Sequence, residues 1–332
     1  MRGLIAELPA QLRWAAAIDP PEVSGAEEAL VAGMGGSGIA GDIAAAAAEA
    51  AGRRVTVHKS YGLPSWAGRA DPLVALVSHS GDTEETLSSA EAARRGGMRP
   101  VVVTGGGRLG AMAAEWGWPA VIVPPGSQPR AAVGHLAGGL LRLLEGAGIV
   151  PDTVGDLHEA AAVVERLLGD GDGPAVALAG DLAEALEGRV AVIYGEHGLA
   201  AVAAGRWKAQ LNENGKAPAY WSVLPELDHN EVVGWDAFPE LGRDRIGVIT
   251  LCDRGAHPRV ALRARLTTES IEGKVGVVGE VEAQGESPLA RLFSLIVIGD
   301  LVSVAVAERA GVDPMPVAPI AELKRRLAEE EA

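Results

Sequence analysis

The sequence has little cysteine, few aromatic side chains and a shortage of positive charge. Cys252 is the only cysteine among 332 residues, which excludes a disulfide framework and a thiolate metal cluster and is typical of a reducing cytosol. The 44 acidic residues outnumber the 29 lysines and arginines, and a net charge of -15 would repel a nucleic-acid backbone. We therefore expect a cytoplasmic protein that binds no nucleic acid.

Long hydrophobic runs are also missing. Nowhere do eighteen uncharged apolar residues follow one another, and Glu7, Pro9 and Gln11 interrupt the stretch where a signal peptide would lie. We therefore expect no membrane partner. Hydrophobic residues make up 48% of the chain but aromatic ones only 4%, so the core must consist mainly of small aliphatic side chains. This composition suits helices packed on buried strands.

The length of the chain exceeds what one hydrophobic core usually supports, so two domains are expected. Short apolar runs alternate with longer helical segments up to a predicted helix over Pro129–Glu145, and the same alternation restarts after a glycine-rich break near residue 150. We predict an α/β fold of two tandem doubly wound parallel-sheet domains, residues 1–150 and 151–332. The predicted strands are Leu30–Ala32, Val55–His58, Leu73–Ser78, Val101–Thr104, Val121–Val123, Arg189–Tyr194, Ala219–Val223, Arg245–Leu251 and Val275–Val278.

A glycine-rich loop follows the first predicted strand. It reads Gly33-Met34-Gly35-Gly36-Ser37-Gly38 and opens an Ala-rich helix, so free backbone N–H groups would converge on an anion there. The same letters match the Gly-x-Gly-x-x-Gly fingerprint of dinucleotide sites. That alternative needs an acidic residue at the end of the second strand, where His58-Lys59-Ser60 stands instead.

A second polar loop follows the third predicted strand and runs from Ser78 to Thr86. Its hydroxyls, Ser78, Ser80 and Thr83, flank Gly81 and include no lysine, which fits a monophosphate better than a triphosphate. The structural alternative is a helix cap in which Ser80 or Thr83 only satisfies backbone N–H groups. Two such loops at the carboxyl ends of neighbouring strands favour a ligand site.

Together the two loops resemble the SIS, or sugar isomerase, domain, which is flavodoxin-like and holds the phosphate of a phosphosugar. The resemblance implies that Gly35, Gly36, Ser37, Ser78, Ser80 and Thr83 bind substrate.

Three further blocks resemble the bifunctional phosphoglucose/phosphomannose isomerase family more specifically. They are Ser127-Gln128-Pro129-Arg130, Gln210-Leu211-Asn212-Glu213-Asn214-Gly215-Lys216 and Pro225-Glu226-Leu227-Asp228-His229-Asn230-Glu231. The resemblance implies an aldose-ketose isomerase that interconverts glucose 6-phosphate or mannose 6-phosphate with fructose 6-phosphate. Glu213 would move the proton between carbons 1 and 2, Arg130 would stabilise the enediolate, and His229 would open the sugar ring. It also implies a homodimer in which the histidine reaches into the neighbouring subunit's active site.

The chemistry of this reaction agrees with those residue types. It requires a carboxylate base, a cation near the developing oxyanion and a group that titrates near neutral pH. The alternatives are a solvated glutamate at the end of a predicted helix, Ala200–Asn214, an arginine in a first helical turn and a loop histidine. No pair among the seven histidines has the spacing of metal ligands, so we expect neither a metal nor another cofactor.

The carboxyl-terminal block from Gly311 to Lys324 resembles the same family. It implies that Lys324 joins ring opening, although a solvated position in a charged helix, Ile320–Glu331, is the alternative. The resemblance places Val317 where bifunctional relatives often carry threonine and single-substrate phosphoglucose isomerases carry glutamine. Valine is as small as threonine, so we expect both epimers to fit. The rival function is a catalytically silent phosphosugar sensor.

Overall fold

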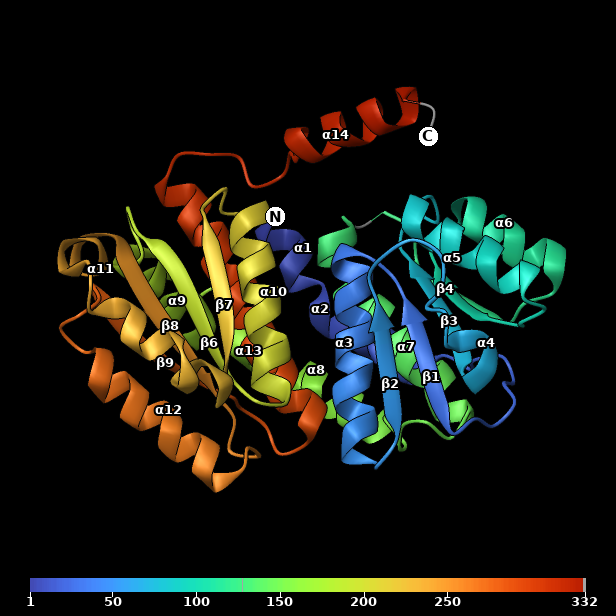
Figure 1. Cartoon of the computed structure of the whole chain (residues 1–332), viewed down its shortest axis with the longest axis horizontal. Coiled ribbons are helices and arrows are strands. Elements are labelled where there is room, and N and C mark those ends of the chain that lie inside the picture. The colour runs from blue at the N-terminus through green and yellow to red at the C-terminus, as the bar shows by residue number, and fades with distance from the viewer. Residues whose placement is uncertain (127, 331–332) are drawn as a thin grey trace.

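The structure, a computed structural model, describes residues 1–126 and 128–330. Figure 1 shows two parallel sheets, each with helices packed against it. The first sheet has the order β2-β1-β3-β4-β5 and the second the order β7-β6-β8-β9. The first order is that of flavodoxin-like folds, and the second follows it over four strands. The predicted fold of two doubly wound α/β units is confirmed.

Each of the nine predicted strands is present among the described residues and begins within two residues of its predicted start. In the first sheet they are β1 (Glu28–Ala32), β2 (Arg54–His58), β3 (Leu73–Ser78), β4 (Val101–Thr104) and β5 (Ala120–Ile122). In the second they are β6 (Val190–Glu196), β7 (Ala219–Leu224), β8 (Ile246–Cys252) and β9 (Val277–Glu282). Neighbouring strands pair in parallel throughout both sheets.

Each central strand of the first sheet is buried on both faces. In β1, Ala29 and Val31 join the main core with α3 (Gly35–Ala50) and α7 (Val133–Gly146). Leu30 and Ala32 point to the other face, where they pack with α5 (Glu84–Arg95) and α6 (Gly107–Trp116). This alternation follows from the two-residue period of a strand, and it explains why the strand reads as a continuous apolar run.

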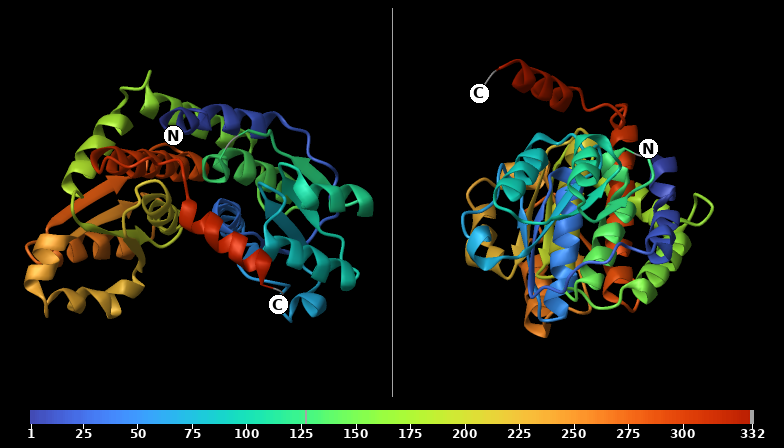
Figure 2. Two further views of the ribbon diagram at one scale, coloured as in Figure 1. Left: turned by 90° about the horizontal axis from the view of Figure 1, so that it is seen from above. Right: turned by 90° about the vertical axis from the view of Figure 1, so that its right-hand side faces the viewer.

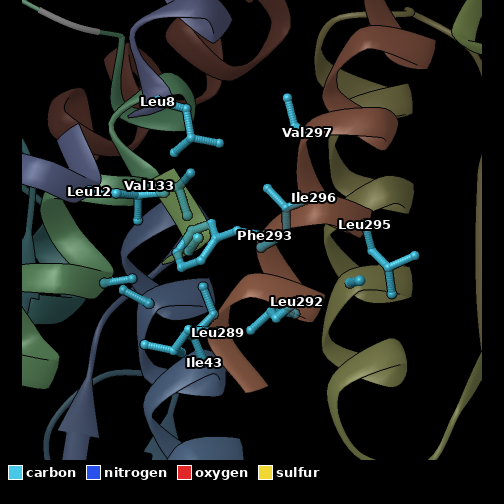
Figure 3. Packing of buried hydrophobic residues seen from close by; sticks show 14 of the residues in the cluster. Leu8, Leu12, Ile43, Val133, Leu289, Leu292, Phe293, Leu295, Ile296 and Val297 are labelled. Atoms are coloured by element: carbon cyan, nitrogen blue, oxygen red, sulfur yellow. The ribbon is translucent and has the colours of Figure 1, made fainter. Parts of the chain in front are cut away.

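Three helices join the two sheets into one hydrophobic core. They are α2 (Leu8–Ala17), α8 (Val154–Leu168) and α13 (Pro288–Arg309), and α8 packs against both of the others. Figure 3 shows Leu8 and Leu12 of α2 close to Phe293 and Ile296 of α13. Helix α13 is long and apolar enough to cross a membrane, with a mean hydropathy of 2.1, but 89% of its most apolar window is buried inside the structure. Helix α13 is therefore a buried helix of the core.

The remaining helices complete the covering layers. They are α1 (Arg2–Ala6), α4 (Ala67–Ala70), α9 (Pro174–Ala185), α10 (Leu199–Glu213), α11 (Pro239–Arg245) and α12 (Pro258–Ile271), whereas α14 (Ala318–Glu329) does not belong to these layers. Short 3-10 helices occupy Pro129–Ala131, Glu226–His229 and Glu231–Trp235. Helices α3 and α10 lie side by side where the two halves meet (Figure 1).

Two predicted helices differ in detail from the structure. The segment predicted as one helix over Pro129–Glu145 is a 3-10 turn followed by α7, and the break at Ala132 lets the backbone carbonyl of Arg130 accept a hydrogen bond from Arg206. The helix predicted over Ala200–Asn214 is α10, and Gly215, which follows its end, does not have the left-handed conformation of a helix-terminating glycine. Lys216 has this conformation instead, with φ 53°, while a side chain at Gly215 would meet the Leu211 carbonyl oxygen at 2.6 Å.

Helix α14 stands apart from the core. None of its residues is buried, and Ile320 and Leu323 are exposed. The end view in Figure 2 shows it above the rest of the molecule, carried by the segment that follows α13. Residue 331, the last of the helix predicted from the sequence, lies outside the described residues.

Candidate active site

The two predicted phosphate loops lie next to each other at the carboxyl edge of the first sheet. The loop after β1 opens α3 at Gly35, and the loop after β3 leads into α5 at Glu84. Because β1 and β3 are paired, their ends are adjacent, and the backbone N–H of His79 donates to Ser37 Oγ at 3.3 Å. The free N–H groups at the beginning of α3 and α5 therefore face one region, as an anion site requires.

Glycine is needed in both loops because the backbone approaches other segments closely. Gly81 has φ 72°, and a Cβ there would meet the Gly106 carbonyl oxygen at 1.9 Å. A Cβ on Gly36 would meet the Pro129 carbonyl oxygen at 2.9 Å. The first loop is thus pressed against the turn that carries Arg130.

The hydroxyls of the second loop divide into two kinds. Ser78 is fully buried, and its hydroxyl donates to Thr83 Oγ1 at 2.9 Å and accepts from the N–H of Gly81 at 3.1 Å, so it shapes the loop. Ser80 is exposed and accepts only a local bond, from the N–H of Asp82 at 3.2 Å. Thr83 precedes α5 without capping it through its side chain. The hydroxyl protons of Ser80 and Thr83 are thus the ones that the loop offers to a ligand.

Glu213 lies at one end of a cleft of about 850 Å³ that runs between α3 and α10. The same end is lined by Gly35, Gly36 and Arg130, so the structure brings these four predicted residues together. The long walls consist largely of small side chains, among them Ala45, Ala46, Ala201, Gly205 and Ala209. Glu213 is half-buried at the last position of α10 and faces a space large enough for a sugar phosphate.

Arg130 is buried in the short 3-10 turn next to that end of the cleft. Its Nε donates to Asn214 Oδ1 at 2.6 Å, and its Nη2 donates to the carbonyl oxygens of Pro314 and Met315 at 2.9 and 2.7 Å. Burial lowers the pKa of the guanidinium, while the nearby Glu213 carboxylate acts in the opposite direction. The carboxyl-terminal segment is thereby tied to the site.

A buried polar network supports this arginine from behind. Arg206 donates to the backbone carbonyl of Arg130 at 2.8 Å and forms an ion pair with Asp300 at 2.7 Å. Gln210 also donates to Asp300, at 2.9 Å, so α10 and α13 share the carboxylate. Each of these side chains is at most 5% exposed, and their rigidity fixes the turn that carries Arg130.

Lys216 is a second cation close to the site. Its ammonium donates to the carbonyl oxygen of Glu213 and, at 3.4 Å, to that of Pro314. Desolvation and the neighbouring Arg130 lower the pKa of Lys216, against the effect of Asp313 and Glu213. The turn after Glu213 is therefore held to the same carboxyl-terminal segment as Arg130.

The remaining predicted residues do not join this cluster within one chain. His229 is exposed after the end of β7, whereas Glu213 precedes the beginning of that strand. Lys324 is exposed on α14, and Val317 is half-buried directly before that helix, two residues after Met315. Of the three, Val317 is the one tied to the site, through the bond between Met315 and Arg130.

A metal site would need several histidine, cysteine or carboxylate side chains around one point. Over residues 1–126 and 128–330, no group of three or more His, Cys, Asp or Glu side chains is placed to hold a metal ion. His79, in the second phosphate loop, is half-buried, and burial lowers its pKa.

From the sequence, Asn214 and Lys216 had no role of their own beyond their place in the block Gln210–Lys216, and the buried pair of Arg206 and Asp300 was not named at all. One signal was present in the sequence. Arg206, Gln210 and Asn214 recur at four-residue spacing, which places three polar side chains on one face of a helix that is otherwise rich in alanine. The bonds of Arg130 to Pro314 and Met315 span more than 180 residues, and no local pattern indicates them.

Comparisons with known proteins concern the chain as a whole rather than its single residues. Residues 175–327 match the family described as the bacterial phospho-glucose isomerase C-terminal SIS domain. A protein of Caldicellulosiruptor bescii named bifunctional phosphoglucose/phosphomannose isomerase is 36% identical over 91% of this chain and 90% of its own length. A protein of the same name from Aquifex aeolicus is 39% identical over 89% and 88%. The crystal structure of a hypothetical protein from Thermus thermophilus has a similar fold, with a TM-score of 0.73, 19% identity and coverage of 98% and 90%.

Proposed function

The chain belongs to the bifunctional phosphoglucose/phosphomannose isomerase family, and we propose that it interconverts glucose 6-phosphate and mannose 6-phosphate with fructose 6-phosphate. The observation that carries this proposal is the meeting of Glu213, Arg130 and the first phosphate loop at one end of a single cleft. Aldose-ketose isomerisation needs those three things in one place: a base, a cation and a phosphate anchor.

The phosphate group is held by the two loops. Backbone N–H groups at the beginning of α3 and the hydroxyls of Ser37, Ser80 and Thr83 donate to its oxygens. Holding the phosphate there directs the sugar carbons toward the other residues of the cleft end, Glu213 and Arg130. Binding energy from the phosphate thus orients the reacting carbons.

Glu213 removes the proton from carbon 2 of the open-chain aldose, the hydroxyl proton passes from oxygen 2 to oxygen 1 of the enediolate, and Glu213 returns its proton to carbon 1. The oxyanion that develops is stabilised by the guanidinium of Arg130, which burial keeps away from competing water. A carboxylate and a fixed cation suffice for this step, so we propose that neither a metal nor another cofactor takes part.

The ring must open before that step, and we assign this to His229 and Lys324. Both residues are exposed, and neither has a described contact with Glu213 in its own chain. We propose a homodimer in which His229 of the partner subunit completes each active site. We propose that Lys324 reaches an active site by movement of α14, whose preceding segment is bound to Arg130 at Pro314 and Met315.

Substrate breadth follows from the size of Val317. A branched aliphatic side chain beside carbon 2 leaves room for the hydroxyl of either epimer. It also offers that hydroxyl no hydrogen bond, at a cost of roughly 1 kcal/mol in each transition state. We therefore propose that both 6-phosphates are substrates.

We also propose that the protein is cytoplasmic and binds neither nucleic acid nor membrane, and that its two domains divide near residue 150. The net charge of -15 supports the absence of a nucleic-acid partner. The burial of α13 supports its role as an internal helix.

A coupled assay tests the function directly. The protein is incubated with glucose 6-phosphate or mannose 6-phosphate in EDTA, and fructose 6-phosphate is followed enzymatically. We expect turnover of both substrates, unchanged by the chelator. Activity that EDTA abolishes and zinc restores would contradict the metal-independent mechanism, and tight binding of both sugars without turnover would identify a phosphosugar sensor.

A further inference from the structure

Two buried arginines lie next to each other in this protein but are partnered differently. Arg206 and Arg130 are 2% and 5% exposed. Arg206 donates to both oxygens of the Asp300 carboxylate, at 3.0 and 2.7 Å. Arg130 donates to three neutral oxygens, those of the Asn214 amide and of the Pro314 and Met315 carbonyls.

The charge of Arg130 is therefore held without a bonded counter-ion. Among residues 1–126 and 128–330 no carboxylate forms an ion pair with it, and the acidic group that acts on it is Glu213, the proposed base. An arginine side chain stays protonated even when it is buried, so the positive charge of Arg130 remains in the site. An anion that forms beside it is stabilised strongly, because the surroundings have a low dielectric and need no rearrangement.

Asn214 is the side chain that holds Arg130 in this state. It is fully buried, and its Nδ2 donates to Ser303 Oγ at 3.0 Å. The hydroxyl proton of Ser303 is used in a bond to the Asp300 carbonyl oxygen at 2.6 Å, so Ser303 can only accept from Asn214. The amide must therefore turn its nitrogen to Ser303 and its oxygen to Arg130.

We propose that Asn214 is a positioning residue. Its neutral amide oxygen fixes the guanidinium of Arg130 without neutralising the positive charge, which can then stabilise the enediolate. The inference rests on the proposed isomerase function for the identity of that anion. An aspartate in the same place would keep the shape and the acceptor but would neutralise the guanidinium. Neutrality of the partner, rather than the hydrogen bond alone, is the property that the site requires.

Binding of two probes isolates this effect from turnover. The first is 5-phosphoarabinonate, whose carboxylate resembles the charge of the enediolate, and the second is sorbitol 6-phosphate, which has hydroxyls there. Both carry the same phosphate, so the ratio of their dissociation constants reports the stabilisation of negative charge near Arg130. Calorimetry on the full-length protein measures both constants.

Two variants of Asn214 separate the effect of the partner's charge from the effect of the hydrogen bond, according to which of them loses more of the preference for the aldonate. We expect Asn214→Asp to lower the preference for the aldonate about 100-fold, the effect of losing one preorganised electrostatic contact. Asn214→Ala leaves the charge and removes one bond to it, so we expect a loss of about tenfold. If Asn214 served only to hold the structure together, the aspartate would be the milder change. An aspartate variant that binds the aldonate as well as the alanine variant, or better, overturns the proposal.

Asn212→Asp is the matched control. Asn212 lies in the same helical turn, and its amide donates to the Ala217 carbonyl at 2.9 Å rather than touching Arg130. The same change of charge there should alter the preference less than about twofold, because half-exposed charges are screened. A loss as large as that of Asn214→Asp would show a general effect of charge and would contradict the assignment.

Ser303→Ala tests the same proposal if both Asn214 variants fail to fold. It removes the acceptor that orients the amide but changes no charge, and we expect the preference for the aldonate to fall about fivefold as Asn214 loses its fixed orientation. An unchanged preference would overturn the proposal. Because the probes need no turnover, a wild type that prefers the aldonate but does not isomerise sugars would refute the proposed function and leave the role of Asn214 standing.

Discussion

Glu213 and His229 lie at opposite ends of strand β7. Glu213 closes α10 close to the beginning of the strand, where Asn212 donates to the Ala217 carbonyl, and His229 follows the end of the strand at Leu224. A strand of six residues spans about 20 Å, so a histidine at that end cannot act on a sugar held by Glu213 of its own chain. Both residues can serve one reaction if two chains share their sites.

The first prediction follows from that separation. Glu213→Gln and His229→Ala should each be inactive, and a mixture of the two, allowed to exchange subunits, should regain activity. Random pairing makes half of the dimers hybrids with one intact site in two, so about a quarter of wild-type activity should return. Mixing each variant with itself is the control. No recovery, although exchange is demonstrated by differently tagged subunits, would mean that each site is self-contained.

The second prediction concerns the phosphate loop after β3. Ser80→Ala removes an exposed hydroxyl donor and should weaken the binding of substrate and of inorganic phosphate alike by about tenfold, or roughly 1.4 kcal/mol. Ser270→Ala removes a hydroxyl that donates to the Thr267 carbonyl in α12 and should leave both constants unchanged. Equal phosphate inhibition of wild type and Ser80→Ala would place the anion on another loop.

The third prediction is a pH dependence of stability that arises at His135. Its ring meets Trp14 edge to face at 4.9 Å, and burial lowers its pKa from 6.5 to about 4, with a smaller effect of His79. The unfolded chain therefore binds a proton between pH 6.5 and 4 that the folded protein does not, and stability falls as the pH decreases through this window. Above pH 6.5 this histidine contributes no slope.

Urea unfolding at several pH values measures this effect. His135→Phe keeps an aromatic ring against Trp14 and should flatten the decline of the unfolding free energy between pH 6.5 and 4, by at most about 3 kcal/mol before solvent screening reduces the figure. An equally steep decline in the variant would assign the proton uptake to other groups. The control is His158→Phe, which makes the same histidine-to-phenylalanine change on α8.

The fourth prediction concerns substrate breadth. The wild type should use both epimers with specificity constants that differ by less than about a thousandfold, or roughly 4 kcal/mol. Val317→Gln should favour glucose 6-phosphate, because a long polar side chain fills the space beside carbon 2. Stronger discrimination by the wild type would mean that another wall of the pocket sets specificity.

Much of the fold could be predicted from the sequence because its signals are local. The strands of the first sheet are short aliphatic runs, such as Val101–Thr104, and each is followed by a helix whose beginning has glycine or hydroxyl residues. The loops that hold Ser37 and Ser80 could be placed for the same reason, since parallel strands end at one edge of their sheet.

The remainder of the site depends on contacts between distant segments. A continuous helix was expected through Arg130, but the chain forms a 3-10 turn there because Arg206 binds the carbonyl that the helix would have used. The partners of Arg130 include carbonyl oxygens of Pro314 and Met315, which any residue type could supply. Composition and spacing carry no information about such bonds.

The most direct test of the account follows the carbon 2 proton. Glucose 6-phosphate incubated in deuterated water should exchange this proton in the wild type, and Glu213→Gln should slow the exchange by about 10²- to 10⁴-fold while substrate binding stays largely intact. Glu49→Gln, at the opposite end of the same cleft, should exchange as the wild type does. Exchange that persists in Glu213→Gln at the wild-type rate would contradict the assignment of Glu213 as the base, and with it the proposed active site.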